Sequence, residues 1–157
     1  MTVRRPVFAV SFAAAGLIAS TALADGRSVP PIRDPLVAKE CGACHMPYPA
    51  GLLPAASWAG IVDGLGNHFG ENASLDATAA AQIKTYLTTN AAAGWRESLR
   101  NLRSGTVVSD ASLRITAQPW FQRKHARRAA PENLQRRGAK SIGDCAACHR
   151  GAVQGNY

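Results

Sequence analysis

Two five-residue segments of this chain repeat one pattern of two cysteines and a histidine. The copies are Cys41-Gly42-Ala43-Cys44-His45 and Cys145-Ala146-Ala147-Cys148-His149, and they use all four cysteines of the chain. Thiols three residues apart lie on one side of a helical turn, where each can form a thioether with one vinyl group of the same porphyrin. The histidine that follows can then ligate the iron. The pattern is typical of two covalently attached c-type haems.

Three other kinds of site also use two cysteines at this spacing. These are a surface disulfide, a thioredoxin-like redox pair and half of a zinc site. A histidine directly after the second cysteine, in both copies, argues against all three. We therefore assign the four cysteines to haem attachment.

The N-terminus has the features of a secretory signal. Arg4 and Arg5 precede an apolar, alanine-rich run from Val7 to Leu23, and Ala22-Leu23-Ala24 is a small-x-small cleavage site. A retained membrane anchor is the alternative, but the run holds few large aliphatic residues and no second such stretch follows. We predict that residues 1–24 are cleaved after Ala24 and that the protein is periplasmic. Covalent haem attachment takes place outside the cytoplasmic membrane in bacteria, which agrees with export.

The remaining 133 of 157 residues are few for two cofactors. At about 65 residues per haem, neither half can bury a large side-chain core of its own, so the haems should serve as the cores. We predict an all-α protein of two small haem-centred domains, the second of them minimal. Residues 25–90 form the N-terminal haem domain, and residues 91–157 form a connector and the C-terminal haem domain.

The axial ligands follow from counting histidines. His45 and His149 belong to the attachment motifs, which leaves His68 and His125 for the second positions of two irons. Methionine is nearly absent, since Met1 leaves with the signal and Met46 adjoins His45. The open alternatives are Met46 serving the other haem, a vacant iron, or a lysine ligand from Lys39, Lys84, Lys124 or Lys140. Which of the two remaining histidines serves which haem is also open.

Local patterns in the first half predict three helices around a proline loop. Asp34 caps a helix that begins at Pro35 and leads into the first motif. The second helix begins at Ser57 and carries His68 on its apolar stripe with Ile61 and Leu65. The third follows Ser74 and buries a stripe of Leu75, Ala79, Ile83, Tyr86 and Leu87. In the loop, the carbonyl of Pro54 is a candidate acceptor for His45 Nδ1.

In the first half the histidine outside the attachment motif, His68, follows the motif. In the second half the corresponding histidine, His125, precedes it. Trp95, Leu99 and Leu102 predict a short amphipathic helix in the connector. Pro119 begins another short helix, on which Phe121 and His125 share a face. Ser141 and Asp144 resemble a capping box before Cys145. With eight residues after His149, no closing helix can follow, so this half must depend on the rest of the chain for cover.

The residues resemble the bacterial dihaem cytochrome c family over nearly the whole mature chain. The resemblance rests on Cys41 to Pro49, Gly51-Leu-Leu-Pro, Ser57-Trp58, His68-Phe69-Gly70, Ala73-Ser74-Leu75, Ile115-Thr116, Pro119-Trp120-Phe121, His125 and Cys145 to His149. It implies a soluble bis-histidine electron-transfer protein whose first domain is similar to class I cytochromes c. It also implies a membrane b-type cytochrome as partner and, in some bacteria, an oxygen-binding monohaem cytochrome c.

Charge is distributed unevenly between the halves. Residues 25–90 carry four lysines and arginines against six acidic residues, whereas residues 91–157 carry twelve against four. Some of the excess can neutralise haem propionates. The remainder is either a solvated face or a docking patch that steers an acidic redox partner. The residues concerned are Arg123, Lys124, Arg127, Arg128, Arg136, Arg137 and Lys140. We expect a monomer that binds no nucleic acid and has possible peripheral membrane contact.

Two histidines on each iron would leave no site for a substrate, so the predicted function is electron relay at low potential, with no catalytic residue. The rivals are a small dihaem oxidoreductase or peroxidase and a gas-binding sensor, each of which needs a vacant or labile iron. Carbon monoxide binding to the reduced protein separates the relay from both.

Overall fold

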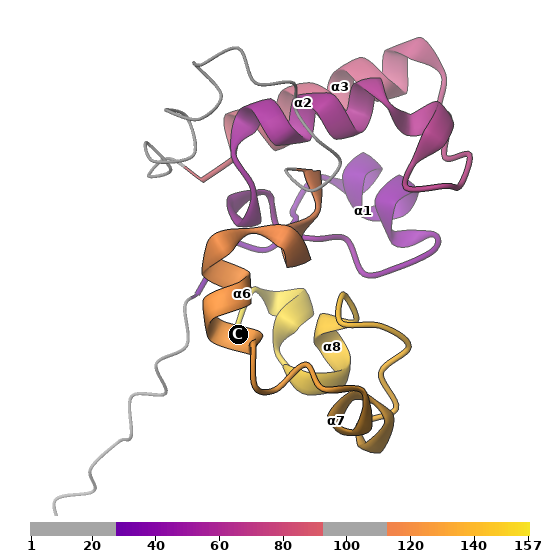
Figure 1. Ribbon diagram of the computed structural model, residues 1–157. Coiled ribbons are helices and arrows are strands. Elements are labelled where there is room, and N and C mark those ends of the chain that lie inside the picture. Colours follow the sequence, from indigo (N-terminus) through magenta and orange to yellow (C-terminus); the bar gives the residue numbers. More distant parts are fainter. Residues whose placement is uncertain (1–27, 93–112) are drawn as a thin grey trace, which may run out of the picture.

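The computed structural model describes residues 28–92 and 113–157, which form two helical lobes (Figure 1). The helices are α1 (Pro35–Gly42), α2 (Ala55–Asp63) and α3 (Ala77–Thr89) in the first lobe, and α6 (Pro119–His125), α7 (Pro131–Arg136) and α8 (Cys145–Cys148) in the second. Within these ranges the chain forms helices, turns and isolated bridges but no strand, which confirms the all-α prediction. The predicted signal and connector helix lie outside the described residues.

Helix α1 begins as its sequence predicts and delivers the first attachment motif. Asp34 Oδ1 accepts hydrogen bonds from the backbone N–H groups of Leu36 and Val37, at 2.9 and 3.0 Å. Pro35 occupies the first turn, where a missing N–H costs nothing. The helix ends at Gly42, so Cys41 lies on its last turn.

The first lobe has a side-chain core of its own. Its buried residues are Val37, Ala50, Leu53, Trp58, Val62, Ile83 and Leu87. Trp58 also donates from Nε1 to the carbonyl of Ala50 at 2.7 Å, which ties α2 to the proline loop. The prediction that neither half buries such a core is therefore wrong for the first half. Three helices and a folded-over loop supply enough apolar surface.

Helix α2 starts earlier and ends sooner than the sequence predicted. Its N-cap is Pro54, and Ser57 lies inside the helix with 2% of its surface exposed, so the predicted serine cap is wrong. The helix ends at Asp63, because Gly64 follows in a non-helical conformation. The sequence predicted that this helix continues to His68. Residues 64–68 instead lie outside it.

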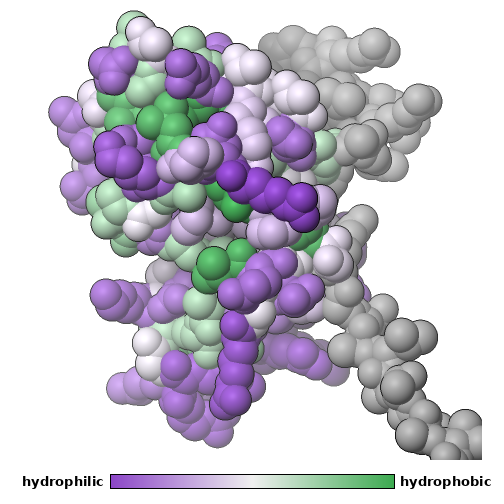
Figure 2. Space-filling model, turned by 180° about the vertical axis from the view of Figure 1, so that it is seen from behind, coloured by the Kyte–Doolittle hydropathy of each residue, from purple (hydrophilic) through white to green (hydrophobic). Residues whose placement is uncertain are grey.

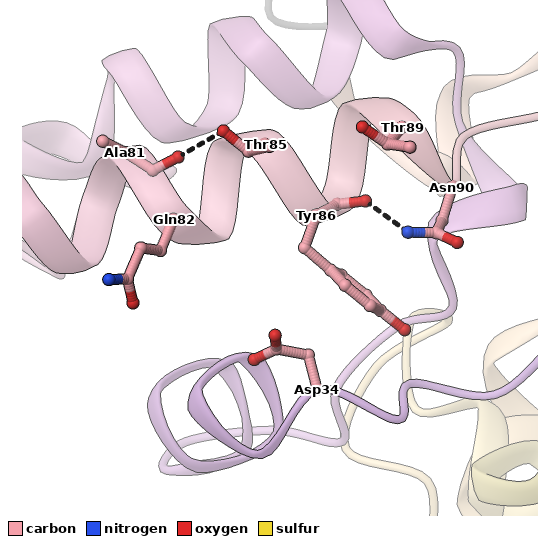
Figure 3. A pocket seen from close by; sticks show the side chains of 7 residues that line it. All are labelled: Asp34, Ala81, Gln82, Thr85, Tyr86, Thr89 and Asn90. Carbon is pink, nitrogen blue, oxygen red and sulfur yellow. Dashed lines mark hydrogen bonds between the residues drawn. The ribbon is translucent and has the colours of Figure 1, made fainter.

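Helix α3 packs against α2 and closes the lobe. Its N-cap Asp76 accepts a hydrogen bond from the backbone of Ala79, and Ile83 and Leu87 are buried as predicted. The hydroxyl of Tyr86 accepts a hydrogen bond from the backbone of Arg33 at 3.0 Å. Figure 3 shows the open groove beside it, between α3 and the start of α1, lined mainly by polar side chains.

The second lobe is short of buried side chains. Apart from Gly155, its buried residues are Gln118, Phe121 and Ala152 among those described. The predicted capping box is replaced by a turn: Ser141 Oγ accepts from the backbone of Gly143, and Asp144 is the N-cap of α8 without a side-chain cap bond.

The lobes are joined through the two ends of the described chain. Ser28 pairs with Asn156 in an isolated bridge, and the backbone N–H of Val29 donates to the carbonyl of Gly155 at 2.8 Å. Ile115 packs on the core of the first lobe. The second half thus obtains cover from the first. None of the helices in the described ranges has both the length and the apolar character needed to cross a bilayer.

Candidate functional site

His45 and His68 face each other in the first lobe. Their ring centroids are 6.2 Å apart and the ring planes differ by 22°. His68 lies in a tight turn rather than on a helix, which corrects the prediction. The backbone N–H of His68 donates a hydrogen bond of 2.6 Å to the backbone carbonyl of Glu71. Gly70, within this turn, has a φ of 107°, which glycine adopts readily.

A backbone hydrogen bond orients the His45 ring. Nδ1 lies 2.7 Å from the carbonyl oxygen of Met46, which leaves Nε2 to point away from the backbone. The predicted acceptor, Pro54, is wrong. Its carbonyl accepts the backbone N–H groups of Ser57 and Trp58 at the start of α2.

His125 and His149 make the corresponding pair in the second lobe. Their centroids are 6.1 Å apart, but the ring planes differ by 74°. His125 ends α6, with Nδ1 3.0 Å from the carbonyl of Phe121 and its ring stacked on the Phe121 ring at 3.9 Å. The predicted shared face of these two residues is confirmed. His149 follows α8 directly, and its backbone N–H donates a hydrogen bond of 2.7 Å to the backbone carbonyl of Cys145.

Both pairs have the spacing required to hold one metal ion between two imidazoles. Two histidines that each bond a metal at about 2 Å have ring centroids about 6 Å apart. The observed 6.2 and 6.1 Å meet this condition at both sites. Each pair includes the histidine of one Cys-x-x-Cys-His motif, so the donor set fits a haem that is attached by thioethers and ligated on both faces.

The surroundings of two of these histidines favour the neutral imidazole. Burial lowers the pKa of His68, and the neighbouring His45 and Arg114 lower it further. Burial likewise lowers the pKa of His149, with smaller contributions from His125, Arg128 and Arg137. A neutral ring keeps the lone pair that a metal ligand needs.

The first cysteine of each motif differs from a reactive redox thiol. Burial raises the pKa of Cys41, and burial raises that of Cys145 to about 11. Reactive thiols of redox pairs have a lowered pKa instead. No disulfide joins the four cysteines, all of which lie in the described part of the chain.

Two of the lysines considered as alternative ligands are engaged elsewhere. Lys39 pairs with Glu40 at 2.7 Å, and Lys84 pairs with Asp63 at the same distance. Both pairs are on the surface of the first lobe. They make these two lysines poor candidates for an iron ligand.

The sequence did not single out two tyrosines that contact these histidines. Tyr48 stacks on His45, with centroids 4.9 Å apart and planes at 27°. Tyr157 meets the ring of His149 edge-on at 5.6 Å. The position of Tyr48, three residues after His45, was a usable signal. Nothing local links the C-terminal residue to His149.

A third aromatic contact lies beside His68. The centroid of the Phe69 ring is 4.8 Å from that of the His68 ring. The backbone of Phe69 has a φ of 58°. The Arg114 guanidinium lies 4.2 Å from the centre of the Phe69 ring. This contact brings the start of the second half against the histidine turn of the first.

Two Cys-x-x-Cys-His segments on helical lobes, each with a second histidine facing the first, define a c-type cytochrome with two haem sites. The dihaem cytochrome c family model matches residues 37–157, and the chain belongs to that family. It therefore carries two covalently bound c-type haems, in a family whose members are generally electron carriers.

Solved structures agree with this assignment. The diheme cytochrome c from Rhodobacter sphaeroides is 48% identical, with a TM-score of 0.68 over 82% of this chain and 100% of that one. A crystal structure of DHC purified from the same organism is 47% identical, with a TM-score of 0.65 over 81% and 99%. A diheme cytochrome from Shewanella baltica OS155 is 36% identical, with a TM-score of 0.61 over 78% and 85%. The curated protein sequences contain no match.

Proposed function

We propose that this protein relays electrons between redox partners through two haems, each ligated by two histidines. His45 and His68 would hold the first iron, His125 and His149 the second. The observation that carries the proposal is the separation of about 6 Å between facing imidazoles in both pairs. The thioether links would be made by Cys41 and Cys44, and by Cys145 and Cys148.

Bound haem supplies a one-electron ferric/ferrous couple. Two histidines at each site would hold the iron and would leave no position for a substrate or a gas. Backbone carbonyls hold Nδ1 of His45 and of His125, which fixes the orientation of both rings for a bound haem. Imidazole in place of methionine lowers the reduction potential, and we expect both potentials to be low.

The proposal is tested by carbon monoxide. Reduced wild-type protein is expected to show no spectral change on addition of carbon monoxide, because no axial position is open. His68→Ala and His125→Ala should each create one reactive haem. Optical spectra of the reduced holoproteins, recorded before and after carbon monoxide, provide the measurement. Binding by the wild type would instead place the protein with the haem oxidoreductases or gas sensors.

Electron paramagnetic resonance gives an independent control on the same variants. Ligand planes 22° apart at one site and 74° apart at the other split the iron d orbitals differently. The oxidised wild type should therefore show two distinct low-spin signals. Each alanine variant should lose a different one, which also identifies the histidine that serves each haem.

We also propose a location and partners. Cleavage of the signal after Ala24 would place the protein in the periplasm, where cytochromes of this kind are typically found. The partners would be a membrane b-type cytochrome and an acidic soluble haem protein. Seven basic residues on the second lobe support an acidic partner, and all seven are exposed: Arg123, Lys124, Arg127, Arg128, Arg136, Arg137 and Lys140. Figure 2 shows that this lobe is largely hydrophilic on the face in view.

Charge reversal on this basic surface is expected to slow association with an acidic partner. In Arg123→Glu/Arg127→Glu, the association rate constant with an acidic monohaem cytochrome c should fall about tenfold at low ionic strength. High salt should remove the difference, because exposed charges are screened. Stopped-flow kinetics on the holoprotein measure it. Arg33→Glu, an exposed arginine on the first lobe, is the control, and an equal loss there would contradict a localised docking surface.

A further inference from the structure

Tyr48 connects the ligand pair of the first lobe to the attachment segment of the second. Its ring stacks on His45 at 4.9 Å. Its hydroxyl donates a hydrogen bond of 2.8 Å to the carbonyl of Gly143, which lies 95 residues away in sequence. Sγ of Cys145 lies 3.4 Å from the same carbonyl oxygen. One side chain and one carbonyl thus span from His45 to Cys145.

Tyr157 approaches the same region from the other side. Its ring contacts His149 at 5.6 Å, and its hydroxyl is buried without a hydrogen-bond partner among the described residues. Burial raises the pKa of Tyr157, and Cys145 and Tyr48 raise it further. Tyr48 thus contacts a histidine of the first pair, and Tyr157 contacts a histidine of the second.

We propose that Tyr48 and the Gly143 carbonyl form the electron path between the two haem sites, which we call the inter-site bridge. The inference rests on the proposed function, since it needs redox centres at both histidine pairs. Electron tunnelling weakens steeply across empty gaps and is favoured by stacked rings and hydrogen bonds. The inter-site bridge supplies one ring contact and one hydrogen bond between the lobes.

The transfer across the inter-site bridge is balanced without further reactants. One electron leaves the reduced site and arrives at the oxidised one, and no covalent bond forms or breaks. Tyr48 remains a neutral phenol throughout, because an ordinary phenol keeps its proton well above neutral pH. It acts as a positioning residue that holds the path in place rather than as a carrier of charge.

The other backbone connection between the lobes does not offer such a path. Val29 and Gly155 join the first and second halves by a hydrogen bond of 2.8 Å. Neither residue is an attachment cysteine or one of the four histidines. The inter-site bridge, in contrast, begins on a ligand ring and ends beside an attachment cysteine.

The experiment compares Tyr48→Phe and Tyr48→Leu with the wild-type holoprotein. Pulse radiolysis reduces one haem of each molecule, and the concentration-independent phase that follows reports electron exchange between the haems. We expect this rate to fall about tenfold or more in Tyr48→Leu, which loses both the ring and the hydroxyl, and less in Tyr48→Phe, which keeps the stack. Tyr86→Phe is the matched control, since its hydroxyl also bonds a backbone group, that of Arg33.

The reduction potentials of the two haems, measured by spectroelectrochemistry, show whether a slower exchange comes from loss of the path or from a changed difference in potential. A slower exchange with both potentials unchanged supports the inter-site bridge. An exchange rate in both Tyr48 variants equal to that of the wild type overturns it, as does an equal loss in Tyr86→Phe. If Tyr48→Leu does not fold, the comparison of Tyr48→Phe with Tyr86→Phe still decides. Carbon monoxide binding by the wild type would mark failure of the proposed function instead.

Discussion

Replacing Cys145 and Cys148 by alanine is expected to unfold residues 113–157 while α1, α2 and α3 stay folded. The second lobe buries Gln118, Phe121 and Ala152 through contacts of the chain itself, and little else. A lobe of this size cannot offset its loss of chain entropy by so small a core. Without thioethers, haem would be retained only by the proposed ligands His125 and His149 and could dissociate.

Hydrogen–deuterium exchange resolved by peptide measures this outcome in the holoprotein variant. Amides of α6, α7 and α8 should lose protection, whereas those of α2 and α3 should keep most of theirs. Intact mass should show one covalent haem fewer than in the wild type. The loss of one haem and the loss of protection are then read from one sample.

The reciprocal variant, Cys41→Ala/Cys44→Ala, is the control. The first lobe has its own buried cluster, which includes Leu53, Trp58 and Ile83, so it should retain protection in α2 and α3. Equal unfolding of both lobes in the two variants would show that neither core suffices without haem, as the sequence alone suggested. Full protection in Cys145→Ala/Cys148→Ala would mean that contacts with the first lobe hold the second together.

The second large effect is expected for Gly155→Ala, which should lower the free energy of unfolding by about 3 kcal/mol. Gly155 has a φ of 82°, where a side chain is strained, and a Cβ there would lie 1.7 Å from the carbonyl oxygen of Val29. Backbone atoms must move to relieve that overlap. The hydrogen bond between Val29 and Gly155 would be lost with it. Chemical denaturation of the holoprotein measures the change.

Gly138→Ala is the control that measures backbone strain alone, without an overlap of atoms. Gly138 has a similar φ of 67°, but nothing lies within 4 Å of the position of its Cβ. We expect a loss of about 1 kcal/mol, the usual cost of a left-handed residue with a side chain. If both variants lost the same amount, the close approach of Val29 to Gly155 would have no energetic weight.

Local sequence predicted the parts of this protein that depend on neighbours along the chain. The two Cys-x-x-Cys-His motifs indicated the cofactor and its number, because attachment needs five consecutive residues. Asp34 with Pro35, and Pro119 with His125, predicted α1 and α6, since caps and proline act within one turn. A count of four histidines selected the same candidates that the structure brings together in pairs.

Local sequence failed where two signals competed. Ser57 was a reasonable cap, but Pro54 begins α2 three residues earlier, and the serine is buried inside the helix. His68 matched a helical stripe, yet the helix ends at Asp63 and the chain turns back at Glu71. Glycines in the pattern weakened the helix enough for the turn to form.

By itself the sequence determined which groups this protein can bind, because thioether attachment and ligand type depend on residue identity and short spacing. Only the tertiary structure decided that His68 faces His45 and His125 faces His149, since a separation of about 6 Å between rings results from how turns and helices pack. It alone placed Tyr48 against Gly143 and Val29 against Gly155. Those contacts join residues far apart in the chain, and no local pattern encodes them.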